Sequence, residues 1–178
     1  MPPADIRLVR VLPEHLDFWL ALRAEPTSRR FVSSEEDSRE SLLKRLMEAS
    51  GEVTQPQAKS FRWMVEVQGQ LAGTVSAREL SRTHGRVVIG YMISEAHQGQ
   101  GVCTRAVGLM LERLFALPFL QRVWLHTLSH NAASQAVARK LGFTHEGTLR
   151  AHVVHDGERF DQQHWGLLRS EWRGVPAR

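Results

Sequence analysis

The chain has 178 residues, of which 42% are hydrophobic and 24% charged, values ordinary for a globular protein that forms one domain over residues 1–178. No apolar run is long enough to span a bilayer, and the first residues lack the basic and apolar segments of an export signal, so no membrane association is expected. The 23 Lys and Arg exceed the 19 Asp and Glu but are dispersed among them, which does not indicate sequence-specific DNA binding.

The first sixty residues predict one strand and two helices. Residues 6–12 have a strand pattern, and a short helix is expected near residues 14–23. A second helix is expected from about Ser34 to Met47, because Ser34 can cap it and acidic residues follow in its first turn. Residues 49–59, which contain a glycine and a proline, predict a loop.

The middle of the chain predicts an antiparallel meander followed by a helix. Apolar runs at residues 61–67, 71–79 and 86–93 are joined by short polar turns, which is typical of neighbouring antiparallel strands. From about residue 101 to 117 the apolar residues recur at helical spacing, so this helix can pack one face on the sheet.

The last third predicts a strand, a helix and a closing hairpin. The strand covers residues 122–128, and a helix over residues 132–141 follows Asn131 as its cap. Strands near residues 144–155 and 159–168 are joined by a tight Asp-Gly turn. The whole order predicts an α/β fold with a mixed, mostly antiparallel sheet and flanking helices.

A glycine-bearing loop lies between the meander and the helix that follows it. Glycines allow several backbone N–H groups to converge at a helix N-terminus, where the helix dipole adds partial positive charge. The loop therefore predicts a phosphate-binding turn, although such a turn also occurs as a plain connection. Its residues are Gln98, Gly99, Gln100, Gly101, Val102, Cys103 and Thr104.

Cys103 is the only cysteine of the chain. A single cysteine excludes an intramolecular disulfide and a cysteine-based metal cluster, and it favours a reducing, cytoplasmic location. The nine histidines are scattered. His126 and His130 are four residues apart, but a strand-to-loop transition is expected between them, so we expect no metal site.

Two segments match motifs of a known family. Gln98, Gly101 and Cys103 stand at the positions of an acetyl-CoA signature whose last residue is ordinarily Gly or Ala, and a second matching segment follows at residues 131–143. Over nearly its whole length the chain thus resembles the GCN5-related N-acetyltransferase (GNAT) superfamily. Cysteine is only slightly larger than alanine, so we expect the turn to tolerate Cys103.

Further segments narrow the resemblance to one branch. They are residues 89–93 before the glycine loop and the expected Glu146-Gly147 and Asp156-Gly157 turns after it. With them, the chain is similar to the RimL and RimJ type of enzyme, which acetylates the N-termini of ribosomal proteins. Members of this kind are often dimers, so a homodimer is compatible with the resemblance.

The resemblance implies acetyl-CoA as cosubstrate and assigns residues to it. The backbone amides of residues 98–104 would bind the pyrophosphate. The strand before the loop would splay from its parallel neighbour, so that the main chain of Met92 and Ile93 pairs with the pantetheine arm. Asn131 and Ser134 would lie along the pantetheine, near the sulfur.

Amide formation needs a neutral amine, a donor for the developing oxyanion and a proton for the departing thiolate. The oxyanion donor is expected to be a main-chain N–H near Met92 or Ile93. In many family members a tyrosine seven residues after the asparagine protonates the thiolate, but Ala138 stands there and the only tyrosine is Tyr91. We therefore predict Ser134 as the catalytic donor; the alternative is a serine that only satisfies the backbone of its helix.

No strong general base is evident in the sequence. Many relatives carry a glutamate on the strand before the loop, where residues 87–89 are apolar here. We predict His152 as the catalytic base, because it is expected on the penultimate strand facing the acceptor groove and histidine titrates near neutrality. An exposed or core-edge histidine is the alternative, and His126, Glu79 and Asp161 are weaker candidates.

The absent base favours an α-amine as acceptor. About a tenth of a free α-amine is neutral at pH 7, against fewer than about one in a thousand lysine side chains. We therefore expect an N-acetyltransferase acting on a protein N-terminus, as in the ribosomal-protein branch. One alternative is a polyamine or aminoglycoside, a polycation whose groove would need acids such as Glu35, Glu36 and Asp37. The other is a CoA-binding module without catalysis.

Overall fold

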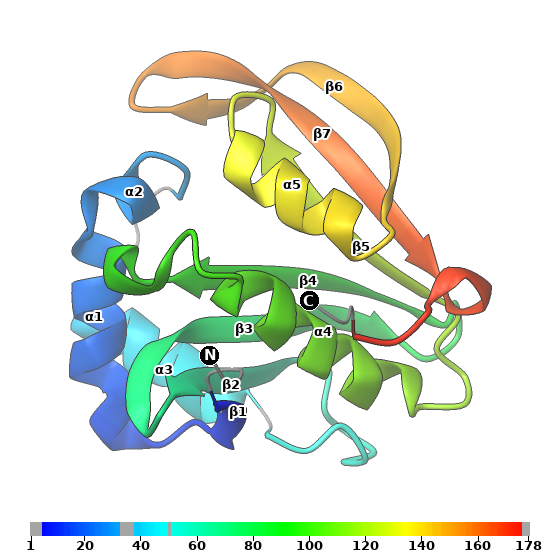
Figure 1. Ribbon diagram of the computed structural model, residues 1–178, viewed down its shortest axis with the longest axis horizontal. Helices are drawn as coiled ribbons and strands as arrows, with labels where there is room; N and C mark the ends of the chain where they lie inside the picture. Colours follow the sequence, from blue (N-terminus) through cyan, green and yellow to red (C-terminus); the bar gives the residue numbers. More distant parts are fainter. Residues whose placement is uncertain (1–4, 33–37, 50, 176–178) are drawn as a thin grey trace.

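The structure is a computed structural model that describes residues 5–32, 38–49 and 51–175. These residues build a seven-stranded sheet in the order β1-β2-β3-β4-β5-β7-β6, in which β4 and β5 run parallel and all other neighbours run antiparallel. The mixed, mostly antiparallel sheet that the sequence predicts is thus confirmed (Figure 1). The strands are β1 (Ile6–Arg10), β2 (Phe61–Val67), β3 (Gln70–Ser81), β4 (Arg86–Ile93), β5 (Arg122–Leu128), β6 (Thr144–His155) and β7 (Glu158–Leu168).

The helices pack on both faces of the sheet. The apolar residues of α4 join a core with Val87 and Ile89 of β4, whereas Met92 packs with a separate cluster from α1 and α3. Because successive strand residues point to opposite faces, α4 lies on one face and the α1/α3 pair on the other. The helices are α1 (Leu16–Ala24), α2 (Pro26–Arg29), α3 (Arg39–Glu48), α4 (Val102–Phe115) and α5 (Ala132–Lys140), with short 3-10 turns η1 (Pro13–His15), η2 (Glu95–His97) and η3 (Arg169–Glu171).

Two local expectations were wrong. The helix expected from Ser34 begins at Arg39, because the hydroxyl of Ser38 supplies the cap by accepting the N–H of Ser41 at 3.1 Å; Ser34 itself lies outside the described residues. The expected Glu146-Gly147 turn is a bulge inside β6, where the pairing with β7 shifts register and then continues. The Asp156-Gly157 turn is confirmed, with φ of 50° and 80°.

The two parallel strands separate part-way along their length. β4 and β5 pair only from Arg86 opposite Arg122 to Val88 opposite Trp124. Beyond that point β4 continues against β3 and β5 continues against β7, and Figure 1 shows the two strands diverging. Within the described residues, the edge of β4 after Val88 therefore has no strand beside it on the β5 side. We refer to this opening as the splay.

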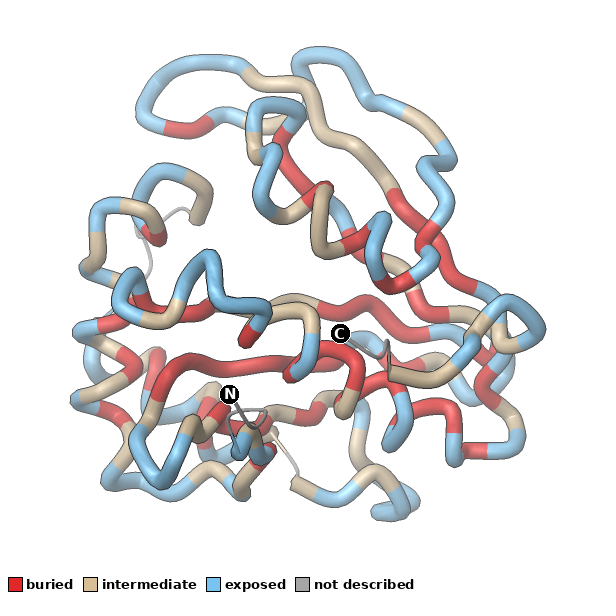
Figure 2. Tube along the Cα trace, viewed as in Figure 1, coloured by how far each residue is buried: buried red, intermediate tan, exposed pale blue. Residues whose placement is uncertain are grey.

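The buried residues lie mainly on the central strands and on the helix faces packed against them. Figure 2 shows that the central strands are mostly buried, whereas the β6-β7 hairpin is mostly exposed or half-buried. Trp19, Trp63 and Trp165 are buried, as expected of core tryptophans. No helix among the described residues is both long and apolar enough to cross a membrane.

Candidate active site

The glycine loop ends in an uncapped helix N-terminus. Gly101 is the N-cap of α4 with φ of 78°, and no side chain caps the helix. The first intrahelical bond runs from the N–H of Arg105 to the carbonyl of Gly101 at 3.0 Å, so the amides of residues 102–104 precede it. Gly99 has φ of 73°, and a Cβ placed on either glycine would meet nothing within 4 Å. This open, left-handed turn with free amides fits a diphosphate.

The two glutamines of the loop form hydrogen bonds that hold its conformation. The side-chain amide of Gln98 donates to the carbonyl of Ile93 at 2.9 Å and to the hydroxyl of Thr27 at 3.3 Å. Gln100 donates to the carbonyl of Ala96 at 2.9 Å. Gln98 thus fixes the loop to the end of β4 and Gln100 fixes it to η2, which leaves the loop's backbone as the part available to an anion.

The end of β4 is held firmly on one side and free on the other. Met92 and Ile93 pair with Thr74 and Gly73 of β3. A side chain on Gly73 would collide with the Met92 carbonyl, so only glycine allows this close approach. Met92 and Ile93 therefore lie, as expected, on the strand edge that borders the splay.

A hydroxyl pair joins β4 to α5 at the splay. The Tyr91 hydroxyl lies 2.7 Å from Oγ of Ser134 and 3.2 Å from the Ser134 carbonyl. Asn131 caps α5 by accepting the Ser134 N–H at 3.0 Å, so the Ser134 hydroxyl is free of the backbone cap. Burial, with a smaller contribution from Cys103, raises the pKa of Tyr91, which keeps its hydroxyl protonated.

Tyr91 is the site residue that sequence reasoning missed. The alternation of side chains along the strand could have revealed it. Tyr91 is two residues beyond Ile89, so it points to the same face as Val87 and Ile89, the face on which α4 packs. Cys103 reaches the same region from α4, and burial raises the pKa of its thiol to about 12. Cys103 is therefore a packed thiol beside Tyr91, in the position that the signature gives to Gly or Ala.

The opposite face of the splay carries basic and aromatic side chains. A Cβ placed on Gly90 would lie 3.9 Å from Nη2 of Arg78, so this guanidinium borders β4 where β5 departs. Across the opening, the rings of Trp124, His126 and His164 pack together with centroids 5.6 to 6.1 Å apart. His126 is exposed on β5, and desolvation by the groups around it, then repulsion from Arg78 and His164, lowers its pKa, so this imidazole is neutral at pH 7.

The structure does not bring the two predicted catalytic residues together. Ser134 contacts Tyr91 on the α4/α5 face, whereas His152 is exposed on β6, beside a bulge at Ala151, and contributes to lowering the pKa of His126. Asp161 is engaged in holding that bulge, because its carboxylate accepts the Ala151 N–H at 2.7 Å. His126 lies on a strand that borders the splay, and the charge of His152 acts on it, so the two histidines lie near each other.

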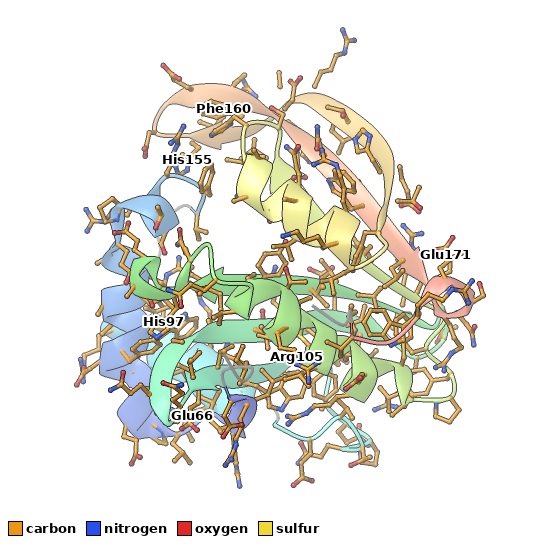
Figure 3. All side chains as sticks on the ribbon, in the orientation of Figure 1. Glu66, His97, Arg105, His155, Phe160 and Glu171 are labelled. Carbon is orange, nitrogen blue, oxygen red and sulfur yellow. The ribbon has the colours of Figure 1, made fainter. Side chains whose placement is uncertain are left out.

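The tip of the β6-β7 hairpin is tied to α2. His155 donates from Nε2 to the carbonyl of Arg29 at 2.8 Å. Phe160 packs on His130 with ring centroids 4.6 Å apart, and Phe31 packs on His130 at 5.4 Å. Figure 3 shows His155 and Phe160 at the hairpin tip beside α2. These contacts bound the splay at its open end.

A family model described as an acetyltransferase (GNAT) domain matches residues 5–144, well over half of the chain. The chain belongs to this family. The expected resemblance to GNAT proteins, including the RimL-like branch, is thereby confirmed. Among the described residues no three His, Cys, Asp or Glu side chains are grouped to hold a metal ion.

Curated GNAT relatives of two kinds are similar to the chain. The ribosomal-protein-serine acetyltransferase of Escherichia coli (strain K12) is 30% identical over 127 residues, 71% of this chain and 68% of the relative. The spermidine N(1)-acetyltransferase of the same organism is 33% identical over 97 residues, which are 54% of this chain and 52% of the relative. YdaF of Bacillus subtilis (strain 168) is 31% identical over 106 residues, 60% and 58%. The chain thus spans between half and two thirds of several relatives it matches.

Solved GNAT structures share the fold. RimL, the ribosomal L7/L12 α-N-protein acetyltransferase, in complex with coenzyme A has a TM-score of 0.80 and 20% identity, covering 92% of this chain and 93% of its own. The spermidine N-acetyltransferase of Vibrio cholerae in complex with CoA and spermine has a TM-score of 0.82 and 21% identity, covering 93% and 96%. At these identities the likeness establishes the fold, and the acceptor must be argued from this chain's own residues.

Proposed function

We propose that this GNAT domain transfers the acetyl group of acetyl-CoA to the N-terminal α-amine of a protein. The observation that carries the proposal is the splay itself. It has the N-terminus of α4, which no side chain caps, and the Tyr91–Ser134 pair on one side, and Arg78 with His126 on the other. A thioester held in the opening would meet a proton donor on one face and an incoming amine on the other.

The cosubstrate would bind along the α4 side of the splay. The amides of residues 102–104 are the proposed ligands of the pyrophosphate, because they point from an uncapped helix end in an open glycine turn. The free edge of β4 at Met92 and Ile93 would pair with the pantetheine amides like an added strand. The acetyl-CoA structures of relatives with this fold support the same ligand. A cytoplasmic location agrees with this cosubstrate.

The chemistry follows from the groups on either side. The amine nitrogen attacks the thioester carbon, and a main-chain N–H near Met92 would stabilise the oxyanion. When the C–S bond breaks, the thiolate takes the proton of the Ser134 hydroxyl. The Tyr91 hydroxyl, kept protonated by its raised pKa, is hydrogen-bonded to Ser134 and can stabilise the serine oxygen as its proton leaves. The serine then regains a proton from solvent, to which the base releases the proton taken from the amine.

The proton lost by the amine needs an acceptor on the other face. His126 is the proposed base, because it lies across the opening from Arg78 and its lowered pKa leaves it neutral at pH 7. His152, exposed on β6, is the second candidate. The adjacent Arg78 guanidinium would also lower the pKa of a docked ammonium group, which raises the fraction of neutral amine.

The charge of the described face favours an N-terminus over a polyamine. Spermidine carries several positive charges, and Arg62 and Arg78 on this face would repel them. Identity to spermidine acetyltransferases keeps a polyamine as the second candidate. The acids that this alternative needs, Glu35, Glu36 and Asp37, lie outside the described residues.

Thiol release from acetyl-CoA tests the proposal directly. The purified chain is assayed with peptides that have free N-termini, with spermidine and with an aminoglycoside, and the products are located by mass spectrometry. We expect turnover of peptides, with the acetyl group on the α-amine. Turnover of spermidine alone would contradict the acceptor, and tight CoA binding without turnover on any amine would contradict catalysis.

A further inference from the structure

Arginine side chains gather on the face of the sheet that α1 and α3 cover. Arg62 of β2 and Arg78 of β3 alternate with core residues that face α4, so both point to the α1/α3 face. Arg23 of α1 and Arg45 of α3 approach from the helices. Burial is the main cause that lowers the pKa of Arg62. The charges of three neighbouring arginines lower it further; they are Arg78, Arg23 and Arg45. The guanidinium remains protonated at pH 7.

Arg62 is an incompletely satisfied buried cation. Its guanidinium stacks over the ring of Trp19, 4.3 Å from the centroid, and Nη1 donates to the hydroxyl of Thr74 at 3.3 Å. Its Nε is buried without a hydrogen-bond partner among the described residues. A buried charged donor that lacks a partner is costly. The charge of Arg62 acts on that of Arg78, so an anion bound at Arg78 would balance part of the positive charge on this face.

Arg78 extends this positive charge to the splay. The side chain is exposed, and its guanidinium borders Gly90, where β4 loses its β5 neighbour. In the described part of the chain, neither Arg62 nor Arg78 forms an ion pair with an acid. The charge of Glu79, the next residue along β3, raises the pKa of His126, whereas desolvation and the neighbouring positive charges lower it. Arg23 and Arg45 have further partners of their own.

We propose that Arg62 and Arg78 form an anion subsite that binds a carboxylate of the acceptor next to its reactive amine. The inference rests on the proposed function and specifies it: the preferred acceptor is an acidic N-terminus, with Asp or Glu within the first few residues. Arginine forks bind carboxylates in two-point contacts. The exposed Arg78 offers such a fork, and the buried Arg62 adds positive charge behind it.

The reactive amine is placed by the same arrangement. Arg78 borders the backbone of β4 on the opposite side from Tyr91, so a carboxylate bound to it would hold the neighbouring α-amine at the splay. An acceptor with basic residues at those positions would bring like charges together, which costs affinity and slows association. Acceptor choice would thus be governed by charge as well as by the amine.

The test compares peptides that differ in one charge. Octapeptides with a free N-terminal serine carry Asp, Asn, Lys or phosphoserine at position 3, and spermidine and O-phosphoethanolamine serve as small acceptors. The values of kcat/KM are measured for the intact chain and for R78Q, R78E and R7Q. Arg7 is a matched control, because it is an exposed arginine that forms an ion pair with Asp5. It lies on β1, at the edge of the sheet and away from the splay. Thermal melts establish that each variant is folded.

We expect the Asp peptide to exceed the Lys peptide by about tenfold or more, a difference that corresponds to about 1.4 kcal/mol. R78Q should reduce this preference, R78E should reverse it and R7Q should keep it. Equal rates on the Asp, Asn and Lys peptides, or an unchanged preference in R78Q, would overturn the subsite while leaving the proposed function intact. A phosphoserine peptide that outranks the Asp peptide would overturn the assignment to a carboxylate.

Failure of the proposed function has a different signature. Turnover of O-phosphoethanolamine but of no peptide, lost in R78Q, would contradict a protein acceptor and support the anion subsite. Turnover of spermidine alone would contradict both.

Discussion

The Tyr91 hydroxyl lies 2.7 Å from Oγ of Ser134, a contact that joins β4 to α5 where β4 and β5 part. In the sequence the two residues are 43 positions apart and belong to different motifs. The contact gives the serine a protonated neighbour on a rigid strand, because burial raises the pKa of the tyrosine. Ser134 is therefore a supported donor and not only a residue of the helix cap.

Removal of the Ser134 hydroxyl should slow the chemical step. We expect S134A to lower kcat by about 100-fold or more, as for loss of a general acid, with little change in acetyl-CoA affinity. Y91F should lower kcat by about tenfold or less, the size of one neutral hydrogen bond. Steady-state kinetics and calorimetric titration with acetyl-CoA check both. An unchanged kcat in S134A would remove the serine from the mechanism.

Crowding the glycine turn should weaken cofactor binding. Gly101 has φ of 78° and open space beside it, so G101V brings both backbone strain and a side chain into the proposed pyrophosphate site. Gly69 is the matched control, since its φ is 80° and the space beside it is also open, but it lies in the β2-β3 turn. We expect acetyl-CoA affinity to fall by about tenfold or more in G101V. Equal affinity in G101V and G69V would contradict the placement of the cofactor.

The pH profile of kcat should report His126. The pKa of this imidazole lies below its ordinary value of 6.5, chiefly because neighbouring groups desolvate it and then because Arg78 and His164 repel its charged form. It is therefore a neutral base at pH 7 and gains a proton only in the acidic range. We expect kcat to fall as the pH drops below that value. H126Q should have a lower kcat that no longer falls at acidic pH, whereas H152Q should keep this acidic limb of the pH profile. A limb that disappears in H152Q instead would make His152 the base.

Cys103 should be chemically quiet in the folded protein. Burial raises the pKa of its thiol to about 12, so the reactive thiolate is scarce at pH 8. Iodoacetamide should label the unfolded chain much faster than the folded one, as followed by intact mass. C103A, which restores a residue ordinary for the signature, should bind acetyl-CoA as the parent does. By solvent accessibility Cys103 is half-buried, so rapid labelling of the folded chain would contradict the raised pKa of its thiol.

The sequence predicted the parts of the fold that depend on local pattern. Strand alternation, helical spacing and the glycine loop gave the order of elements, and the Asn131 cap and the Asp156-Gly157 turn are confirmed. The start of α3 was misplaced, because Ser34 and Ser38 are both serines that can cap a helix, and the sequence does not distinguish them; Ser38 is the cap. Glu146-Gly147 has turn composition, but pairing with β7 outweighs it.

The site was less predictable because it is made by pairs of distant residues. Periodicity places Tyr91 and Arg78 on opposite faces of the sheet, but only the register of β3 against β4 sets Arg78 beside Gly90. His152 was chosen for its strand, and the bulge at Ala151 could not be foreseen from the pattern of β6. The roles of Ser134, His126 and the loop amides remain predictions for the variants above.

The most direct measurement is mass spectrometry of protein N-termini in cells with and without this gene. We predict that at least one N-terminus loses its acetyl group on deletion, and that the parent chain restores it while S134A does not. N-terminal acetylation that is unchanged by deletion, together with a loss of acetylated polyamines, would contradict the proposed acceptor.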